Sequence, residues 1–117
     1  MYVYNRGKVV YNKVGRAVSF YRRFKGLMWK KALDNGEGLW IARCSQVHMF
    51  NMRFPLDIIY LDKHDQVVRI DTLRPWQVGG YVRGAKSVLE VTAGSAAANG
   101  ILPGDYLELG EKAQRKV

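Results

Sequence analysis

A segment of fourteen residues, 44–57, gathers side chains of many chemical kinds in a short stretch of chain. Its sequence, CSQVHMFNMRFPLD, places a thiol, an imidazole, a guanidinium and a carboxylate among two methionines and two phenylalanines. Polar groups of different chemistry that converge beside apolar ones are what a ligand pocket needs. The segment therefore predicts a binding site that includes His48, Asn51, Arg53 and Asp57.

Two other parts of the chain can complete this site. Glu90 stands inside the apolar run 87–92, where a buried acid needs a partner. Trp76 and Tyr81 belong to a predicted loop over 74–85, which carries a proline and three glycines and could act as a lid. We expect the ligand to be a small molecule or a peptide.

A structural role is the alternative for the same polar residues. In that interpretation they satisfy backbone groups of a central strand, and Asp57 and Glu90 pair with Arg53 or Arg83 to hold the strands together. A second alternative is an enzyme in which His48 is a general base and Arg53 holds an anion. No catalytic triad or paired-carboxylate motif occurs, so the sequence favours binding over catalysis.

Metal and nucleotide motifs are also missing from the sequence. The two histidines, His48 and His64, show no HxH spacing, and the one cysteine allows no CxxC motif or internal disulfide. The stretch 79–87 nearly spells a phosphate-binding loop, but an extra alanine precedes its lysine and a strand, not a helix, is predicted to follow. We therefore expect neither a metal nor a cofactor.

The positive charge of the chain is concentrated at its start. Net charge is +9; residues 1–33 carry nine basic and no acidic residues, while residues 34–117 carry ten of each. Interleaved aromatic residues would suit weak, sequence-independent nucleic-acid binding, and a solvated basic face is the other interpretation. The candidate nucleic-acid contacts are Lys13, Arg16, Arg22, Arg23, Lys25, Lys30 and Lys31.

Most of the elements that must position these residues are predicted to be strands. A helix is expected to begin at the N-cap Ser19 and to end at Asn35-Gly36, and a helical turn is expected over 93–100. Pro and Gly inside 102–105 predict a type II turn. The predicted strands cover 8–18 (one strand, or two with a bend at Gly15), 39–44, 48–54, 56–62, 67–73, 87–92 and 106–109.

This order of elements predicts a mainly β protein (β-rich α+β), a compact sandwich or jelly-roll-like barrel with one flanking helix. With 117 residues, 48% of them apolar, we expect one domain over 1–117 with a frayed tail at 110–117. No signal peptide or membrane span is recognisable, so the cytoplasm is the expected location. The expected core contains Leu27, Met28, Leu39, Ile41, Ile59, Leu61, Leu89, Val91 and Leu107.

Several short motifs, in this order and spacing, resemble the family known as domain of unknown function 192. They are Gly26-Leu27-Met28, Gly38-Leu39-Trp40, the run from His48 to Asp57, Val88-Leu89-Glu90-Val91 with Ala93-Gly94, and Gly104-Asp105. The resemblance covers about residues 22–109. It implies a β-rich, jelly-roll-like single domain without an established activity. Many members have a Trp-Met-Lys-Asn-Thr run where this chain has His48-Met-Phe-Asn-Met-Arg, so no role of that tryptophan or lysine carries over.

Overall fold

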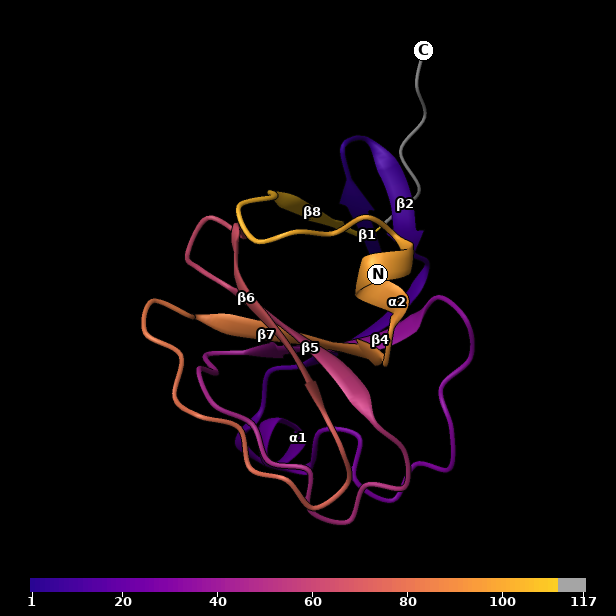
Figure 1. Ribbon diagram of the computed structural model, residues 1–117, viewed down its shortest axis with the longest axis vertical. Coiled ribbons are helices and arrows are strands. Elements are labelled where there is room, and N and C mark those ends of the chain that lie inside the picture. Colours follow the sequence, from indigo (N-terminus) through magenta and orange to yellow (C-terminus); the bar gives the residue numbers. More distant parts are fainter. Residues whose placement is uncertain (112–117) are drawn as a thin grey trace.

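Within residues 1–111, eight strands form two sheets, and two short helices accompany them (Figure 1). The computed structural model describes residues 1–111, without the side chain of Phe20. The strand orders are β2-β1-β8 and β3-β4-β7-β5-β6. The mainly β prediction with a helix on its flank is confirmed. In chain order the elements are β1 (Tyr2–Asn5), β2 (Lys8–Tyr11), β3 (Lys13–Ala17), α1 (Phe20–Lys25), β4 (Glu37–Ala42), β5 (Leu56–Leu61), β6 (Val67–Leu73), β7 (Ser87–Thr92), α2 (Ser95–Ala98) and β8 (Leu107–Gly110).

The five-stranded sheet is the platform of the molecule. Its strands pair antiparallel except for β3 and β4, which run parallel. All six residues of β5 are buried, as are the first five of β7. Strands covered on both faces are near-continuous apolar runs, and LDIIYL and VLEV follow that pattern except for one acid in each. These two acids are Asp57 and Glu90.

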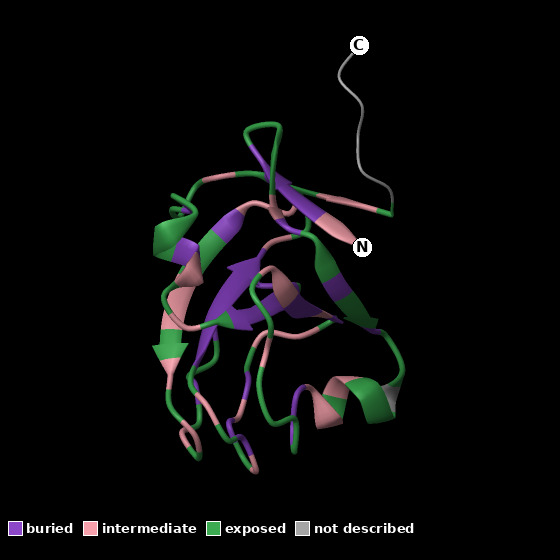
Figure 2. Ribbon diagram, turned by 90° about the vertical axis from the view of Figure 1, so that its right-hand side faces the viewer, coloured by how far each residue is buried: buried purple, intermediate pink, exposed green. Residues whose placement is uncertain are grey.

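The two faces of this sheet bury different clusters. One face meets β1, β8 and α2, and packs Ile59 and Leu89 against Val3. The other face is covered by α1 and by the segments that follow β4 and β6, and packs Ile41 against Met49. Figure 1 shows α1 on the opposite side of the sheet from the three-stranded sheet, and Figure 2 shows the buried strands between them. All nine residues of the predicted core are buried.

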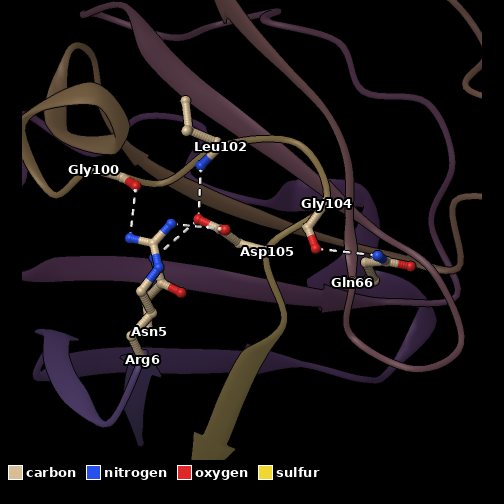
Figure 3. Close-up of polar contacts among 7 residues, drawn as sticks. All are labelled: Asn5, Arg6, Gln66, Gly100, Leu102, Gly104 and Asp105. Atoms are coloured by element: carbon tan, nitrogen blue, oxygen red, sulfur yellow. Dashed lines mark hydrogen bonds and ion pairs between the residues drawn. The ribbon is translucent and has the colours of Figure 1, made fainter.

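Asp105 links the turn between β1 and β2 to the turn before β8 (Figure 3). Its Oδ1 accepts a hydrogen bond from Arg6 Nη2 at 3.0 Å. Its Oδ2 accepts from Asn5 Nδ2 at 3.1 Å and from the Leu102 N–H at 2.9 Å. These bonds, led by that of the Leu102 amide, hold the pKa of Asp105 below its usual range. This carboxylate therefore helps to position β8 beside β1.

The helix α1 is much shorter than predicted. Ser19 Oγ accepts a hydrogen bond from the Arg22 N–H at 3.2 Å, so the predicted N-cap is confirmed. The helix ends at Lys25, however, well before the expected stop at Asn35-Gly36. Gly26 leaves the helical conformation with φ 51° and ψ −127°, and its N–H donates to the Arg22 carbonyl. Leu27 and Met28 after Gly26 are buried by turns of the chain and not by a helical face.

The segment 48–54 is not a strand, which corrects the prediction. Its only ladder contact is an isolated bridge between His48 and Val78. The Met52 N–H donates to the Met49 carbonyl at 3.3 Å, so the chain turns here. Both methionines are buried, and their spacing of three residues fits a turn better than the two-residue period of a strand.

Near the ends of the chain the structure also departs from the prediction. β1 was not predicted, and the expected strand 8–18 is divided into β2 and β3 at Asn12 rather than at Gly15. Gly110 pairs with Tyr2 inside β8, while residues 112–117 of the predicted tail lie outside the described residues.

Two turn predictions near the C-terminus are confirmed. The expected helical turn contains α2, and Gly100 follows it with φ 67°. In the expected type II turn Gly104 has φ 96°, and the Asp105 N–H donates to the Leu102 carbonyl at 3.0 Å.

None of the helices among residues 1–111 has the length and apolar character needed to cross a membrane.

Candidate ligand pocket

Glu90 is an acid at the centre of the five-stranded sheet. It lies in β7 and pairs with Leu39 of β4 and with Ile58 of β5. Residues directly opposite each other on neighbouring strands share a face of the sheet. Leu39 and Ile58 both belong to the cluster beneath α1. Glu90 therefore projects from the sheet toward α1.

Among residues 1–111, the carboxyl group of Glu90 has no hydrogen-bond or ion-pair partner. Glu90 is 4% exposed, and its Oε1 makes no hydrogen bond. No ion pair among residues 1–111 includes it. Burial raises the pKa of Glu90 to about 8, because it removes water from the charged form. At neutral pH Glu90 is therefore largely a neutral acid, with both donor and acceptor capacity.

The end of α1 lies directly over this acid. A Cβ atom added to Gly26 would lie 3.3 Å from Glu90 Oε1 and 3.8 Å from the Cδ1 atom of Ile41. Gly26 also has φ 51°, a conformation that side chains rarely adopt. A glycine is thus needed here both for the turn and for the close approach of the backbone to Glu90.

A cavity of about 320 Å³ lies between α1 and the sheet, and we call it the Glu90 pocket. This volume is at the lower end of the range for small-molecule sites. Glu90, Cys44, Ser45, Gln46 and His48 contribute polar or sulfur atoms, and Arg23, Lys25 and Arg43 contribute positive charge. The rest of the wall consists of Phe24, Gly26, Leu27, Met28, Ile41, Val47 and Met52.

Cys44 and His48 share this pocket but do not form an activated nucleophile. The Cys44 Sγ donates to the Gln46 carbonyl at 3.2 Å, and burial raises the pKa of the thiol. A reactive cysteine needs a lowered pKa. His48 Nδ1 accepts the Phe50 N–H at 3.2 Å, so neutral His48 carries its proton on Nε2 and presents a donor. The chemistry of this pair suits binding better than catalysis.

A row of aromatic rings extends from the pocket along the surface. The His48 ring centroid lies 5.5 Å from that of Phe24 and 4.7 Å from that of Phe50. Phe50 in turn lies 6.0 Å from Trp76. Trp76 and Tyr81, the predicted lid residues, are both exposed and do not line the pocket. Phe50 and His48 lie between the Trp76 ring and the pocket.

Asp57 lies on the opposite face of the sheet from Glu90. It pairs with Val91, the residue after Glu90, and consecutive residues of a strand point to opposite faces. Its Oδ1 accepts from Thr72 Oγ1 at 2.7 Å, and its Oδ2 accepts from the N–H groups of Gly94 and Ala96 at 3.0 and 3.1 Å. Asp57 therefore fastens the start of α2 to the sheet and cannot share a pocket with Glu90.

The predicted ion pairs of these acids are wrong. Within residues 1–111, no ion pair joins Asp57 or Glu90 to Arg53 or Arg83. Both arginines are exposed, because they lie in loops and not in the strands that carry the acids. The backbone amides before α2 satisfy Asp57 in place of an arginine.

Of the predicted ligand residues, His48 and Glu90 line the pocket and the others do not. Asn51 lies in the turn after His48 with φ 59°, and its carbonyl accepts the Trp29 N–H at 3.1 Å. This bond joins the segment after α1 to the segment after β4. Arg53 follows it on the surface.

The predicted nucleic-acid contacts are divided by the structure. Lys13 and Lys30 pair with Asp34 and Glu37 at 3.8 and 3.0 Å. Arg16 pairs with Glu111. Arg23 Nε donates to the Ala42 carbonyl at 2.7 Å. In the part of the chain that is described, the side chains of Arg22, Lys25 and Lys31 remain without an ion pair or hydrogen bond.

Sequence reasoning missed two walls of the pocket. The spacing around Gly26 predicts a long helix, and Cys44 stands at the end of the predicted strand 39–44. A glycine inside an apparently helical pattern was the available signal, since such a residue marks a helix end or a close contact. No local pattern indicates that Cys44 and Gly26 lie at the same cavity, because the two residues are brought together only by the tertiary fold.

Comparison with known proteins agrees with this architecture. The model of the DUF192 family, whose description reads "Uncharacterized ACR, COG1430", matches residues 2–109. A UPF0127 protein of Pyrococcus furiosus is 33% identical over 106 residues, which cover 88% of this chain and 91% of that protein. A UPF0127 protein of Thermococcus sibiricus is 31% identical over 93 residues, which cover 76% of this chain and 60% of that protein.

A solved structure resembles the fold as well. The crystal structure of a protein of unknown function from Novosphingobium aromaticivorans matches with a TM-score of 0.78 and 27% identity. The match covers 92% of this chain and 82% of that one. The family model spans nearly all of the described residues, as does the shared fold. This chain belongs to the DUF192 family.

Proposed function

We propose that this protein is a binding module that takes a small organic molecule into the Glu90 pocket. The observation that carries the proposal is the Glu90 carboxyl group, which is buried at the pocket wall with no hydrogen bond to Oε1. Leaving a buried polar group unpaired costs about 1–3 kcal/mol. A ligand that supplies the missing partner recovers that free energy on binding.

The remaining walls support a ligand with an apolar body. Leu27, Met28 and Ile41 are buried residues around the acid, and they offer contact surface without competing polar groups. Methionine side chains adapt their shape to different ligands. A few polar groups in a mainly apolar cavity fix the orientation of a bound molecule.

Binding is favoured over catalysis by the state of the two most reactive side chains. The Cys44 thiol has a raised pKa, and the His48 Nδ1 atom is already engaged by a backbone amide. A general base needs a free basic nitrogen within reach of a substrate. His48 Nε2–H instead provides a hydrogen-bond donor at the wall of the pocket, while the Cys44 thiol already donates to the Gln46 carbonyl.

The test uses Cys44, the one cysteine of the chain, as a reporter at the pocket wall. Four probes with a six-carbon chain are compared at millimolar concentration: hexanol, hexylamine, hexanoate and 6-aminohexanoate. At least one of them should slow alkylation of Cys44 by iodoacetamide and shift the backbone amide signals of Gly26 and Glu90. Amide signals of Gly100 and Gly104, which do not line the pocket, serve as controls.

A blocked pocket provides the matched comparison. Once Cys44 is fully carboxamidomethylated, the probe that bound should bind more weakly, because the added group occupies part of the cavity. If all four probes leave the alkylation rate and the amide signals of Gly26 and Glu90 unchanged, the proposed function is wrong.

A further inference from the structure

An acid and three basic residues lie at different depths of the Glu90 pocket. Among its described lining residues Glu90 is the one acid, and it is buried. The basic residues Arg23 and Lys25 are half-buried, and Arg43 is exposed. The pocket therefore has an acid at its floor and positive charge at its mouth.

The basic residues at the mouth are held away from the acid by backbone carbonyls. Arg23 Nε donates to the Ala42 carbonyl at 2.7 Å, and its Nη2 donates to the Arg43 carbonyl. Arg43 Nη2 donates to the Val18 carbonyl at 2.9 Å. These bonds fix two guanidinium groups at the rim, so that neither neutralises Glu90.

We propose that the Glu90 pocket binds a small zwitterion, with an ammonium group against Glu90 and an acidic group at the mouth beside Arg43 and Lys25. This inference rests on the proposed binding function and names the chemical class of its ligand. The apolar residues between floor and mouth, Leu27 and Met28 among them, would contact a methylene spacer. A ligand with both charges would complement both ends of the pocket.

Binding of an ammonium group changes the protonation of the acid. A cation within about 4–6 Å favours the ionised form of a carboxyl group. Glu90 would then release its proton to solvent, and the resulting carboxylate would accept hydrogen bonds from the ligand ammonium. Amine and carboxylate thus form an ion pair in a site from which water is largely removed, where electrostatic interactions are strong.

The experiment compares the same four six-carbon probes by NMR titration at pH 7.5. We expect 6-aminohexanoate to bind at least tenfold more tightly than hexanol or hexanoate, with hexylamine between them. Glu90→Gln keeps the size of the side chain and removes its ability to ionise. It should weaken 6-aminohexanoate at least tenfold and change the affinity for hexanol less than twofold.

The mouth is tested with a pair of matched arginine variants. Arg43→Gln should weaken 6-aminohexanoate severalfold and should not weaken hexylamine, which has no acidic end. Arg83→Gln removes an exposed arginine that does not line the pocket, and it should change neither affinity. Equal losses for both ligands in Arg43→Gln would contradict the placement of the acidic group.

The outcomes separate the two proposals. If no probe binds, the binding function itself is wrong and the zwitterion proposal falls with it. If probes bind but hexanoate is the tightest, or if Glu90→Gln leaves the order unchanged, only the zwitterion proposal is overturned. If hexanoate binds most tightly, protonated Glu90 would act as the hydrogen-bond donor to the carboxylate of that probe.

Discussion

Two buried acids on neighbouring strands of one sheet have opposite surroundings. Asp57 pairs with Val91, and Glu90 pairs with Ile58, so a shift of one residue places the acids on opposite faces. Asp57 faces the start of α2 and receives three hydrogen bonds. Glu90 faces the cavity beneath α1, and no partner reaches its Oε1. We interpret the first acid as structural and the second as functional.

Glu90→Gln should change how stability depends on pH. With a folded pKa of about 8 and a usual value of 4.5, native Glu90 keeps its proton at pH values where the unfolded chain has lost it. The unfolding free energy therefore falls as pH rises from about 4.5 to 8, by up to about 1.4 kcal/mol per pH unit. Above pH 8 this contribution is constant.

The measurement is urea unfolding of the parent protein and Glu90→Gln between pH 5.5 and 8.5. The difference between the two proteins isolates Glu90, because the other groups around the pocket (Arg23, Lys25, Arg43, Cys44 and His48) are present in both. Relative to the parent, the variant should gain stability as pH rises. A difference that does not vary with pH would show that Glu90 has an ordinary pKa.

Asp57→Ala should strongly destabilise the fold. It removes the acceptor of three hydrogen bonds and leaves the N–H groups of Gly94 and Ala96 without a partner. Unsatisfied buried groups cost about 1–3 kcal/mol, so we expect a loss of about 2–4 kcal/mol in denaturant unfolding. Thr72→Val, which removes one donor to the same acid, should lose about 1 kcal/mol. Equal losses in both variants would contradict the role given to the backbone amides.

At the scale of elements, the end of α1 decides the shape of the pocket. Gly26→Ala would place a Cβ 3.3 Å from Glu90 Oε1 at φ 51°. Such a backbone conformation costs about 1–3 kcal/mol for a residue with a side chain, and thermal unfolding should detect that loss. Gly80→Ala is the control, since a Cβ there would meet nothing within 4 Å and should change stability little. Similar melting temperatures for both variants would place the end of α1 elsewhere.

The central strands could be predicted from sequence because burial on both faces produces uniform apolar runs. β5 and β7, which are buried in this way, lie within one residue of their predicted bounds at each end. The segments around the pocket could not be predicted in this way. Gly26-Leu27-Met28 continues the apolar spacing of α1, and 48–54 alternates like a strand, although tertiary contacts fold both into turns.

The candidate site, like the fold, could be predicted from sequence only in part. Glu90 and His48 were identified from their chemical types, but Asp57 was grouped with them because sequence distance does not show which face of a sheet a residue occupies. The register β4–β7–β5 settles that question, and it depends on pairings between strands far apart in the chain. Arg23 and Arg43 also line the pocket, and their bonds to the carbonyls of Ala42 and Val18 join parts of the chain about twenty residues apart.

At the scale of the whole molecule, the net charge of +9 keeps nucleic-acid binding as a prediction. Only Arg22, Lys25 and Lys31 of the seven proposed contacts are without side-chain partners among the described residues. With about 0.9 counterions released per phosphate contact, three contacts predict a slope of about −2.7 for log K against log salt on a DNA duplex. Fluorescence titration at several salt concentrations measures it.

The control for that experiment is Arg22→Gln beside Arg69→Gln. The first should reduce the slope by about 0.9 if Arg22 contacts a phosphate. Arg69 is exposed, pairs with Asp71 at 2.7 Å and lies outside the basic segment, so its loss should not alter the slope. Absence of binding at low salt, or an equal effect of both variants, would leave the basic segment as a solvated surface.

A measured pKa of Glu90 would show whether this acid is buried without a partner at the pocket wall. The side-chain carboxyl carbon of Glu90 can be followed by ¹³C NMR from pH 4 to pH 10, with Glu90→Gln identifying its signal. We predict a single titration with a midpoint near 8, since burial without a partner raises the pKa of this acid. A midpoint near the usual 4.5 would mean that the carboxyl group is hydrated or already paired, and would contradict the account.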